Sequence, residues 1–253
     1  MGALRRTSSV LTALAAASLV LGGCAADRQP ETSSAAVVTP DPPSRSVDAS
    51  RTQPGRDLDT HAHSTTDPRS IWVVVNKTHP ITPLTFRPQL SIVRGYQVAT
   101  PAAGPLTDLL AASDSAGLGF KIASAFRSFD YQERVHRNLV ASQGQQAADR
   151  VSARPGYSEH QTGLAVDLIT PGSPSCDFDQ CFAHTPGGRW LTEHAWEYGF
   201  LVRYTPRNEA VTGYEPEPWH LRYVGKPLAT AMHNAGVTTL EEFLGVPGGD
   251  YPR

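Results

Sequence analysis

An aspartate lies inside one of the most apolar short segments of the chain. The segment runs from Gly163 to Ile169, and Asp167 stands in it between Val166 and Leu168. Its length and the turn residues after it are typical of a strand at the centre of a sheet. Burying a carboxylate there costs several kcal/mol unless a metal, an ion pair or several donors compensate it. The segment therefore predicts a central strand with a polar site built onto it.

The neighbours of Asp167 leave room for a ligand. Alternation along a strand places Asp167 on the same face as Ala165 and Gly163, whose side chains are small or absent. His160 stands seven positions before Asp167, in the polar loop that leads into the strand. We therefore expect His160 and Asp167 to approach one ligand above the sheet.

A second group of chemically active residues lies in the sequence E-P-E-P-W-H, where Glu217 precedes His220 by three positions. An extended chain separates these two side chains too far for a shared hydrogen bond, but both can converge on one ligand from opposite sides. With His160 and Asp167, His220 completes two imidazoles and one carboxylate, which is the donor set of a catalytic zinc site with an open fourth position. Glu217 is then the candidate base, because zinc makes its bound water more acidic.

The two motifs together, S-x-H-x-x-G-x-A-x-D from Ser158 to Asp167 and E-x-W-H from Glu217 to His220, resemble the VanY-type zinc D-alanyl-D-alanine carboxypeptidases. The resemblance covers about residues 73–224 and includes an S-x-x-R-S turn at residues 124–128. It implies that Arg127 binds the scissile carbonyl and its developing oxyanion, a role that suits a permanently charged guanidinium. A salt bridge at the start of a helix is the alternative for Arg127.

The implied activity is removal of the terminal D-Ala from peptidoglycan stem peptides, with one Zn²⁺ per chain. Action as an L,D-carboxypeptidase on tetrapeptides or as a wall endopeptidase would use the same catalytic residues. A non-catalytic peptidoglycan-binding lipoprotein is a further alternative, because a fold does not fix a function. The presence of both motifs intact favours an enzyme.

Other residues near these motifs are candidate substrate contacts. Ser158 and Gln132 match positions that the family uses around its site. Arg154 could meet the C-terminal carboxylate of a substrate, and Trp219 could wall the site or belong to the core. The remaining histidines considered have no acidic partner at a metal-site spacing and are expected outside the site: His136, His184, His194 and His233.

The N-terminus has the features of an export signal. Arg5 and Arg6 precede an apolar run over residues 10–21, which is too short for a membrane-spanning helix. The run ends in Leu-Gly-Gly-Cys, which resembles the lipobox of bacterial lipoproteins and makes Cys24 the lipidated first residue of the mature chain. The alternative is an ordinary secretory signal with a chance cysteine. Both predict export, and the first predicts a lipid anchor on the outer face of the cytoplasmic membrane.

Export also affects how the other two cysteines are interpreted. Cys176 and Cys181 flank a polar loop, and an oxidising compartment favours a disulfide between them. A zinc pair is the rival interpretation, but C-x-x-x-x-C without a second pair is a weak metal signature. We therefore expect a disulfide that closes a small loop.

The remaining organisation follows from composition and periodicity. Residues 1–23 form the predicted signal, residues 24–70 a disordered tether rich in Ser, Thr and Pro, and residues 71–253 a single zinc-peptidase domain. Net charge is -2, which gives no sign of a nucleic-acid partner, and we expect a monomer. Mixed strands and helices predict an α+β fold, a small antiparallel sheet with flanking helices. Strands are predicted over 71–75, 120–126, 163–169, 200–204 and 219–224, and helices over 105–116, from 128 to about 139, and over 190–198, 228–234 and 240–244.

Overall fold

The computed structural model describes residues 58–252 and has a four-stranded antiparallel sheet at its centre. The strand order is β3-β4-β6-β5, and the strands are β3 (Lys121–Ser124), β4 (Ala165–Ile169), β5 (Phe200–Tyr204) and β6 (Glu217–Tyr223). β4 and β6 each have a hydrogen-bonded strand on both sides. The strand that contains Asp167 is therefore central, as the sequence predicts.

The register of the sheet aligns the polar residues of three strands. Asp167 on β4 lies directly opposite His220 on β6 and opposite Ser124 on β3. Residues opposite each other in an antiparallel pair have neighbouring side chains on one face. Hydrogen bonding between strands thus brings Asp167 and His220 together although 53 positions separate them.

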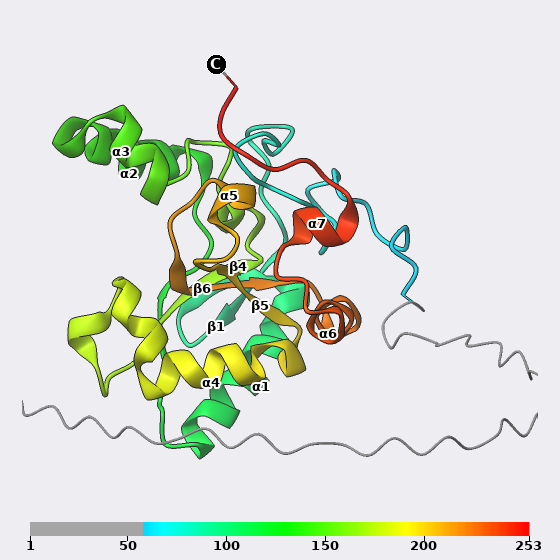
Figure 1. Ribbon diagram of the computed structural model, residues 1–253, viewed down its shortest axis with the longest axis vertical. Helices are drawn as coiled ribbons and strands as arrows, with labels where there is room; N and C mark the ends of the chain where they lie inside the picture. Colours follow the sequence, from blue (N-terminus) through cyan, green and yellow to red (C-terminus); the bar gives the residue numbers. More distant parts are fainter. Residues whose placement is uncertain (1–57, 253) are drawn as a thin grey trace, which may run out of the picture. The chain divides into compact units, whose positions relative to one another are not determined.

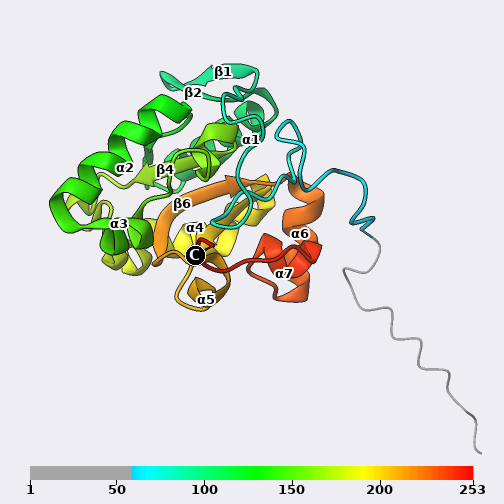
Figure 2. The same cartoon turned by 90° about the horizontal axis from the view of Figure 1, so that it is seen from above.

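Helices and short turns surround the sheet (Figure 1). In both views α2 and α3 lie at one end of the sheet and α6 and α7 at the other (Figures 1 and 2). The α-helices are α1 (Thr100–Ser115), α2 (Phe129–Gln143), α3 (Gln145–Val151), α4 (Pro186–His194), α5 (Glu209–Thr212), α6 (Lys226–Ala235) and α7 (Leu240–Leu244). The 3₁₀ turns are η1 (Glu159–Thr162), η2 (Pro174–Cys176), η3 (Gln180–His184) and η4 (Ala195–Tyr198), and β1 (Leu90–Val93) and β2 (Tyr96–Ala99) form a separate hairpin.

The helices match the sequence predictions in type but not always in their bounds. Ser128 caps α2 as predicted, because its side chain accepts a hydrogen bond from the backbone N–H of Tyr131. α1 begins at Thr100 rather than at the predicted Pro105, since Pro101 already occupies its first turn, where no intrahelical N–H is needed. The predicted helix 190–198 is divided into α4 and η4 and ends, as expected, at a left-handed Gly199.

The predicted strand at Ile71–Val75 is wrong. The segment is buried, but outside any sheet its backbone bonds to other partners: Nη2 of Arg222 donates to the carbonyls of Ile71 and Val73 at 3.1 and 2.7 Å. A buried guanidinium therefore takes the place of a neighbouring strand. Trp72 and Val74 pack in a core cluster with residues of α6 and α7, and Leu58 packs against the same cluster, whereas Val73 and Val75 belong to the larger core cluster. Packing thus begins before Ile71.

The fold class is α+β, as predicted, and the larger core cluster joins α1 to the sheet. Cys176 and Cys181 form the expected disulfide. Within residues 58–252 no helix is long and apolar enough to cross a membrane. The predicted signal peptide and Cys24 lie outside the described residues.

Candidate active site

Three buried side chains from three elements converge as the sequence predicts. His160 is on η1, Asp167 on β4 and His220 on β6. Nε2 of His160 lies 3.2 Å from Oδ2 of Asp167, and Nδ1 of His220 lies 3.3 Å from Oδ1. One potential ligand atom from each residue lies within 4.8 Å of the other two. Among residues 58–252 this is the group of His, Cys, Asp and Glu side chains that could hold a metal ion.

Within the part of the chain that the structure describes, two buried polar atoms of this group lack a hydrogen-bond partner. Nε2 of His160 and Oδ1 of Asp167 are buried and have no hydrogen-bond partner within the described residues. A buried polar atom without a partner costs about 1–3 kcal/mol, and a cation among these atoms would remove that cost. Two imidazoles and one carboxylate are also the donors that a catalytic zinc site uses. The residues therefore fit zinc.

The charge around His220 also favours a cation. Burial lowers the pKa of His220, but the carboxylates of Asp167 and Glu159 beside its two ring nitrogens outweigh burial and raise the pKa to about 9 in the metal-free chain. The two carboxylates thus favour a positive charge at this position. A divalent cation would supply that charge and leave the imidazole neutral, as a metal ligand must be.

The orientation of His160 is fixed by the turn that follows β3. Nδ1 of His160 lies 2.8 Å from the carbonyl of Ala125, which can only accept, so Nδ1 carries the proton. The backbone N–H of Arg127 donates to the carbonyl of His160 at 3.1 Å. Burial and the nearby Arg127 charge lower the pKa of His160 to about 4 and keep the ring neutral. Nε2 is therefore available as a ligand atom.

Gly163 allows the sharp turn between His160 and β4. Its φ is +69°, and a Cβ at this position would lie 2.8 Å from the backbone nitrogen of Ala99. That same nitrogen donates to the Gly163 carbonyl at 2.8 Å. The glycine of the S-x-H-x-x-G motif is therefore required by both backbone conformation and close packing.

Glu217 lies beside the three ligand candidates. Its Oε2 is 3.5 Å from Nδ1 of His220, closer than a regularly extended chain would bring them. The reason lies in the pairing of β6 with β5: Val202 is opposite Leu221 but Tyr204 is opposite Glu217. β6 therefore bulges between Glu217 and Leu221 and is not regularly extended there.

The environment of Glu217 suits a general base. Burial, reinforced by the Asp167 charge, raises the pKa of Glu217 to about 7, although His220 and Arg127 oppose the shift. A base whose pKa is close to the working pH can both accept and return a proton. The side chain is 19% exposed, so solvent can reach it.

Arg127 lies in the turn between β3 and α2 and contacts the same space. It lines a cavity of about 60 Å³ together with Glu217, His160, His220 and Ser158. Within residues 58–252 its guanidinium forms no ion pair, and its Nε is buried without a hydrogen-bond partner. The alternative of a helix-start salt bridge is therefore not observed, and the charge is free to meet a ligand in the cavity.

A family model described as D-alanyl-D-alanine carboxypeptidase, VanY, matches residues 95–226, more than half of the chain. The chain belongs to the VanY family. YodJ of Bacillus subtilis (strain 168) is 34% identical over 189 residues, which cover 70% of this chain and 68% of YodJ. Residues 95–226, which the family model matches, contain Arg127 and the three ligand candidates His160, Asp167 and His220.

Solved structures of the family agree with this assignment. The LdcB LD-carboxypeptidase has a TM-score of 0.64 and 33% identity, and covers 72% of this chain and 89% of its own. A variant of the vancomycin resistance D,D-pentapeptidase VanY in complex with Zn(II) has a TM-score of 0.59 and 33% identity. The match covers 68% of this chain and 97% of the VanY chain. The chain is thus an enzyme of a zinc-dependent carboxypeptidase family, with a single peptidase fold.

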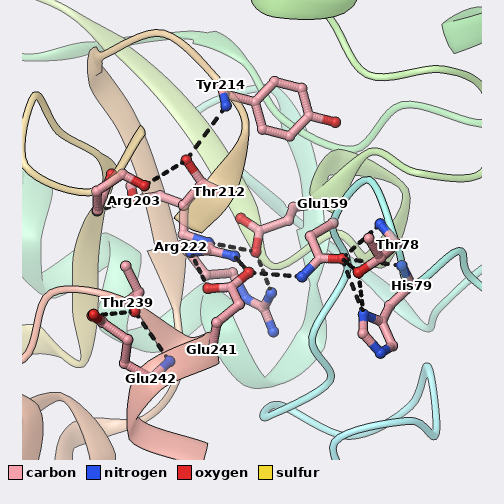
Figure 3. Close-up of polar contacts among 12 residues, drawn as sticks. Thr78, His79, Glu159, Arg203, Thr212, Tyr214, Arg222, Thr239, Glu241 and Glu242 are labelled. Carbon is pink, nitrogen blue, oxygen red and sulfur yellow. Dashed lines mark hydrogen bonds and ion pairs between the residues drawn. The ribbon is translucent and has the colours of Figure 1, made fainter. Parts of the chain in front are cut away.

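One residue of this VanY-family site was missed by the sequence analysis. Glu159 is fully buried, and its Oε2 lies 3.3 Å from Nε2 of His220. Its Oε1 accepts hydrogen bonds from Nε of Arg203 at 2.9 Å and from Nη1 of Arg222 at 2.8 Å (Figure 3). Burial alone would raise the pKa of Glu159, but the two arginines hold it well below its usual value. A charged Glu159 therefore fixes the ring of His220.

The network continues to α7. Arg203 also forms a two-pronged ion pair with Glu241, at 2.9 and 2.7 Å, and all these side chains are buried. The sequence does contain a sign of this network: β5 and β6 each carry one arginine, Arg203 and Arg222, among apolar residues. A buried charge of this kind requires a charged partner. Arg203 and Arg222 are thus recognisable from the sequence in the same way as Asp167, but their carboxylate partners are not.

The predicted substrate contacts have different positions in the structure. Ser158 is buried and lines the 60 Å³ cavity. Gln132 lies behind this cavity: its Nε2 donates to Oγ of Ser152 at 3.2 Å and to the carbonyl of Ala153 at 2.7 Å. Both of these residues line the cavity. Gln132 therefore supports the wall and does not itself line the space.

The prediction for Arg154 is not supported. Its guanidinium donates to both carboxylate oxygens of Asp149, at 3.2 and 2.8 Å, and lies 4.0 Å from the ring centre of Tyr251. It is not among the residues that line the cavity next to Glu217. An arginine paired in this way is not free to bind a substrate carboxylate.

The histidines expected outside the site lie outside it. His136 and His194 do have acidic neighbours: Asp149 lies 3.0 Å from His136, and Glu197 and Glu193 lie 2.9 and 3.9 Å from His194. His233 stacks on Trp196, and neither it nor His184 joins the metal-binding group. Among residues 58–252 neither His136 nor His194 belongs to a group of donors that could hold a metal ion.

Proposed function

We propose that this protein is a zinc D,D-carboxypeptidase that removes the terminal D-Ala from peptidoglycan stem pentapeptides. The observation that carries the proposal is the convergence of His160, Asp167 and His220 within 4.8 Å, with Glu217 beside them. These three residues would hold the zinc. Membership of the VanY family supports the same substrate class.

Each remaining site residue has a defined task in hydrolysis. Zinc, when bound, would supply Lewis acidity to the reaction. Glu217 accepts a proton from the attacking water and then returns it to the amine of the leaving D-Ala. Arg127 donates hydrogen bonds to the carbonyl oxygen, whose negative charge is largest in the transition state. Water is thus added across the amide, and the products are a shortened peptide and free D-Ala.

L,D-carboxypeptidase action on tetrapeptides is a second candidate. It is favoured by the similarity to the LdcB LD-carboxypeptidase, whose TM-score of 0.64 exceeds the 0.59 of the VanY structure. Both reactions release one C-terminal D-Ala and need the same base and cation. They differ in the residue that precedes the scissile bond, which is D-Ala in the pentapeptide and an L-configured centre in the tetrapeptide. Substrate choice therefore depends on the cleft beside the site.

The test is hydrolysis of two synthetic stems by the full mature chain. Zinc-loaded protein is incubated with pentapeptide or tetrapeptide, and released D-Ala is followed by mass spectrometry. Activity that is lost on chelation and restored by zinc, with preference for the pentapeptide, supports the D,D-carboxypeptidase. Preference for the tetrapeptide supports the second candidate. Glu217→Gln should bind zinc as the wild type does but release no D-Ala, and full activity in this variant would overturn the mechanism.

We further propose that the enzyme is exported and held at the outer face of the cytoplasmic membrane by a lipid on Cys24, and acts there as a monomer. The support is the basic, apolar and small-residue pattern of residues 1–24. Incorporation of labelled palmitate into the wild-type chain, and its absence in Cys24→Ala, is the expected result. Release of unlabelled protein into the medium by both would favour an ordinary secretory signal.

A further inference from the structure

A larger cleft opens beside the candidate catalytic residues. Its volume is about 580 Å³, and Arg127, Asp167 and Glu217 form one part of its lining. Trp219, the neighbour of His220 on β6, forms another part, together with residues from the disulfide-closed loop between Cys176 and Cys181. A substrate that reaches Glu217 from this side must pass along the loop.

Phe178 is the most unusual residue of this loop. Its side chain is 53% exposed although it is large and apolar. Its φ is +57°, a left-handed conformation that within the described residues only Arg94 shares among non-glycine residues. Such a conformation is unfavourable for a bulky residue, and observed strain of this kind often accompanies function. The phenyl ring lies at the cleft rather than in the core.

The ring of Phe178 has a defined partner. It meets the Trp219 ring edge to face, with the ring centres 5.8 Å apart and the planes at 73°. Aromatic pairs favour this geometry. Because both residues line the cleft that Glu217 lines, the two rings form a continuous apolar surface next to the reacting group. We call this pair the aromatic wall.

The loop that contains Phe178 is held on both sides. The disulfide joins its ends, and Cys176 packs against the main core cluster. Asp179 caps η3 by accepting a hydrogen bond from the backbone N–H of Cys181 at 2.8 Å. A cross-link of this kind limits the conformations open to the loop. Phe178 is therefore fixed in place before any substrate arrives.

We propose that Phe178 is a substrate-binding residue of this enzyme, and that the Cys176–Cys181 disulfide positions it. The ligand is the part of the stem peptide on the N-terminal side of the scissile bond, whose methyl groups and extended backbone pack on the aromatic wall. Phe178 has no group that takes part in proton transfer, so it binds substrate and transition state alike. Such a residue affects KM rather than kcat. This inference rests on the proposed function.

The experiment compares Phe178→Ala with the wild type and with Phe178→Tyr. Phe178→Ala should raise KM for the preferred stem peptide about tenfold while kcat and zinc content stay unchanged. The substitution removes the exposed part of the ring, on which the peptide would bury its apolar surface. Phe178→Tyr keeps the ring and should keep KM. Ile92→Ala is the matched control, since Ile92 is also exposed, at 65%, but lies on β1 away from the cleft. An unchanged KM in Phe178→Ala overturns the proposal.

A second comparison tests the disulfide. The double variant Cys176→Ser and Cys181→Ser should raise KM in the same direction, and adding Phe178→Ala to it should raise KM no further. Equal additive effects would show that the disulfide acts independently of Phe178 and would overturn its positioning role. Thermal unfolding of each variant separates this result from a general loss of structure.

Peptide binding distinguishes failure of this proposal from failure of the proposed function. Binding of stem pentapeptide to zinc-loaded Glu217→Gln is measured by calorimetry, with and without Phe178→Ala. A wild type that releases no D-Ala would contradict the proposed function, whereas a Kd that Phe178→Ala leaves unchanged would contradict the aromatic wall. Weaker peptide binding by the variant that carries Phe178→Ala supports the aromatic wall whether or not the wild type releases D-Ala.

Discussion

Nε2 of His220 faces Oε2 of Glu159 at 3.3 Å, while Nδ1 of the same ring faces Oδ1 of Asp167 at 3.3 Å. A carboxylate that accepts a hydrogen bond from one ring nitrogen fixes the tautomer, and the other nitrogen then has its lone pair available for a metal. Glu159 can do this because Arg203 and Arg222 hold its other oxygen. The buried ion network therefore acts on the site through His220.

Glu159→Gln should weaken zinc binding by about 10- to 100-fold, the usual effect of losing such a partner of a metal ligand. Competition with a chromogenic chelator measures it. Glu241→Gln is the control, because Glu241 pairs with Arg203 but does not contact His220. Both variants should lose several kcal/mol of stability, since each leaves the two buried arginines with one carboxylate fewer. Equal zinc affinity in the two variants would contradict the role of Glu159.

Arg127→Ala should lower kcat by about 10²–10³-fold, as expected for loss of a donor to a developing oxyanion. Zinc content should not change, since Arg127 bonds to His160 through its backbone N–H, which the substitution keeps. Steady-state kinetics with the stem pentapeptide provides the measurement. A variant with normal kcat and raised KM would assign Arg127 to substrate binding alone.

Arg154→Ala should leave kcat/KM on the stem peptide within about twofold of the wild type, because its guanidinium already pairs with Asp149. It should lower the free energy of unfolding by ~1 kcal/mol, a modest value because the side chain is 38% exposed to solvent. Urea unfolding and peptide kinetics on one preparation test both statements. A tenfold rise in KM would instead restore the original assignment to a substrate carboxylate.

Asp149 should make the fold sensitive to acid. Burial tends to raise the pKa of Asp149, but hydrogen bonds from Arg154, Gln145 and His136 lower it from 3.8 to about 2. Since the folded pKa lies below the unfolded one, its contribution is fully present above pH 3.8 and is lost as pH falls toward 2. Urea unfolding from pH 6 to pH 2 should show the wild type more stable than Asp149→Asn by ~1 kcal/mol at pH 6, with the difference disappearing near pH 2. A difference independent of pH would show that charge is not its source.

The site was predictable from the sequence where its chemistry depends on local motifs. His160 and Asp167 lie seven positions apart on a turn and the strand that follows it, and a carboxylate inside an apolar strand required an explanation by itself. His220 and Glu217 came from a second short motif. The bulge in β6 that brings these two together depends on pairing with β5, which no local pattern specifies.

Long-range partners account for what the sequence did not predict. Glu159 is 44 positions from Arg203 and 63 from Arg222, and nothing in the spacing relates them. The false strand at residues 71–75 has the same origin: β-branched residues indicated a strand, but Arg222 occupies the carbonyls that a neighbouring strand would need. Similarly, the aromatic wall depends on how the disulfide loop lies against β6.

The position of Glu241 in the sequence affects when the buried ion network can form during synthesis. Within residues 58–252 the buried network contains two guanidinium groups, and one of the two carboxylates that neutralise them is on α7. During synthesis the ribosome delivers Arg203 and Arg222 before Glu241. Until α7 docks, one positive charge in the interior has no counterion, and Glu159 is shared by both arginines. We therefore expect the metal centre to mature only after α7 has emerged and docked, so that products terminated before α7 are inactive rather than partly active.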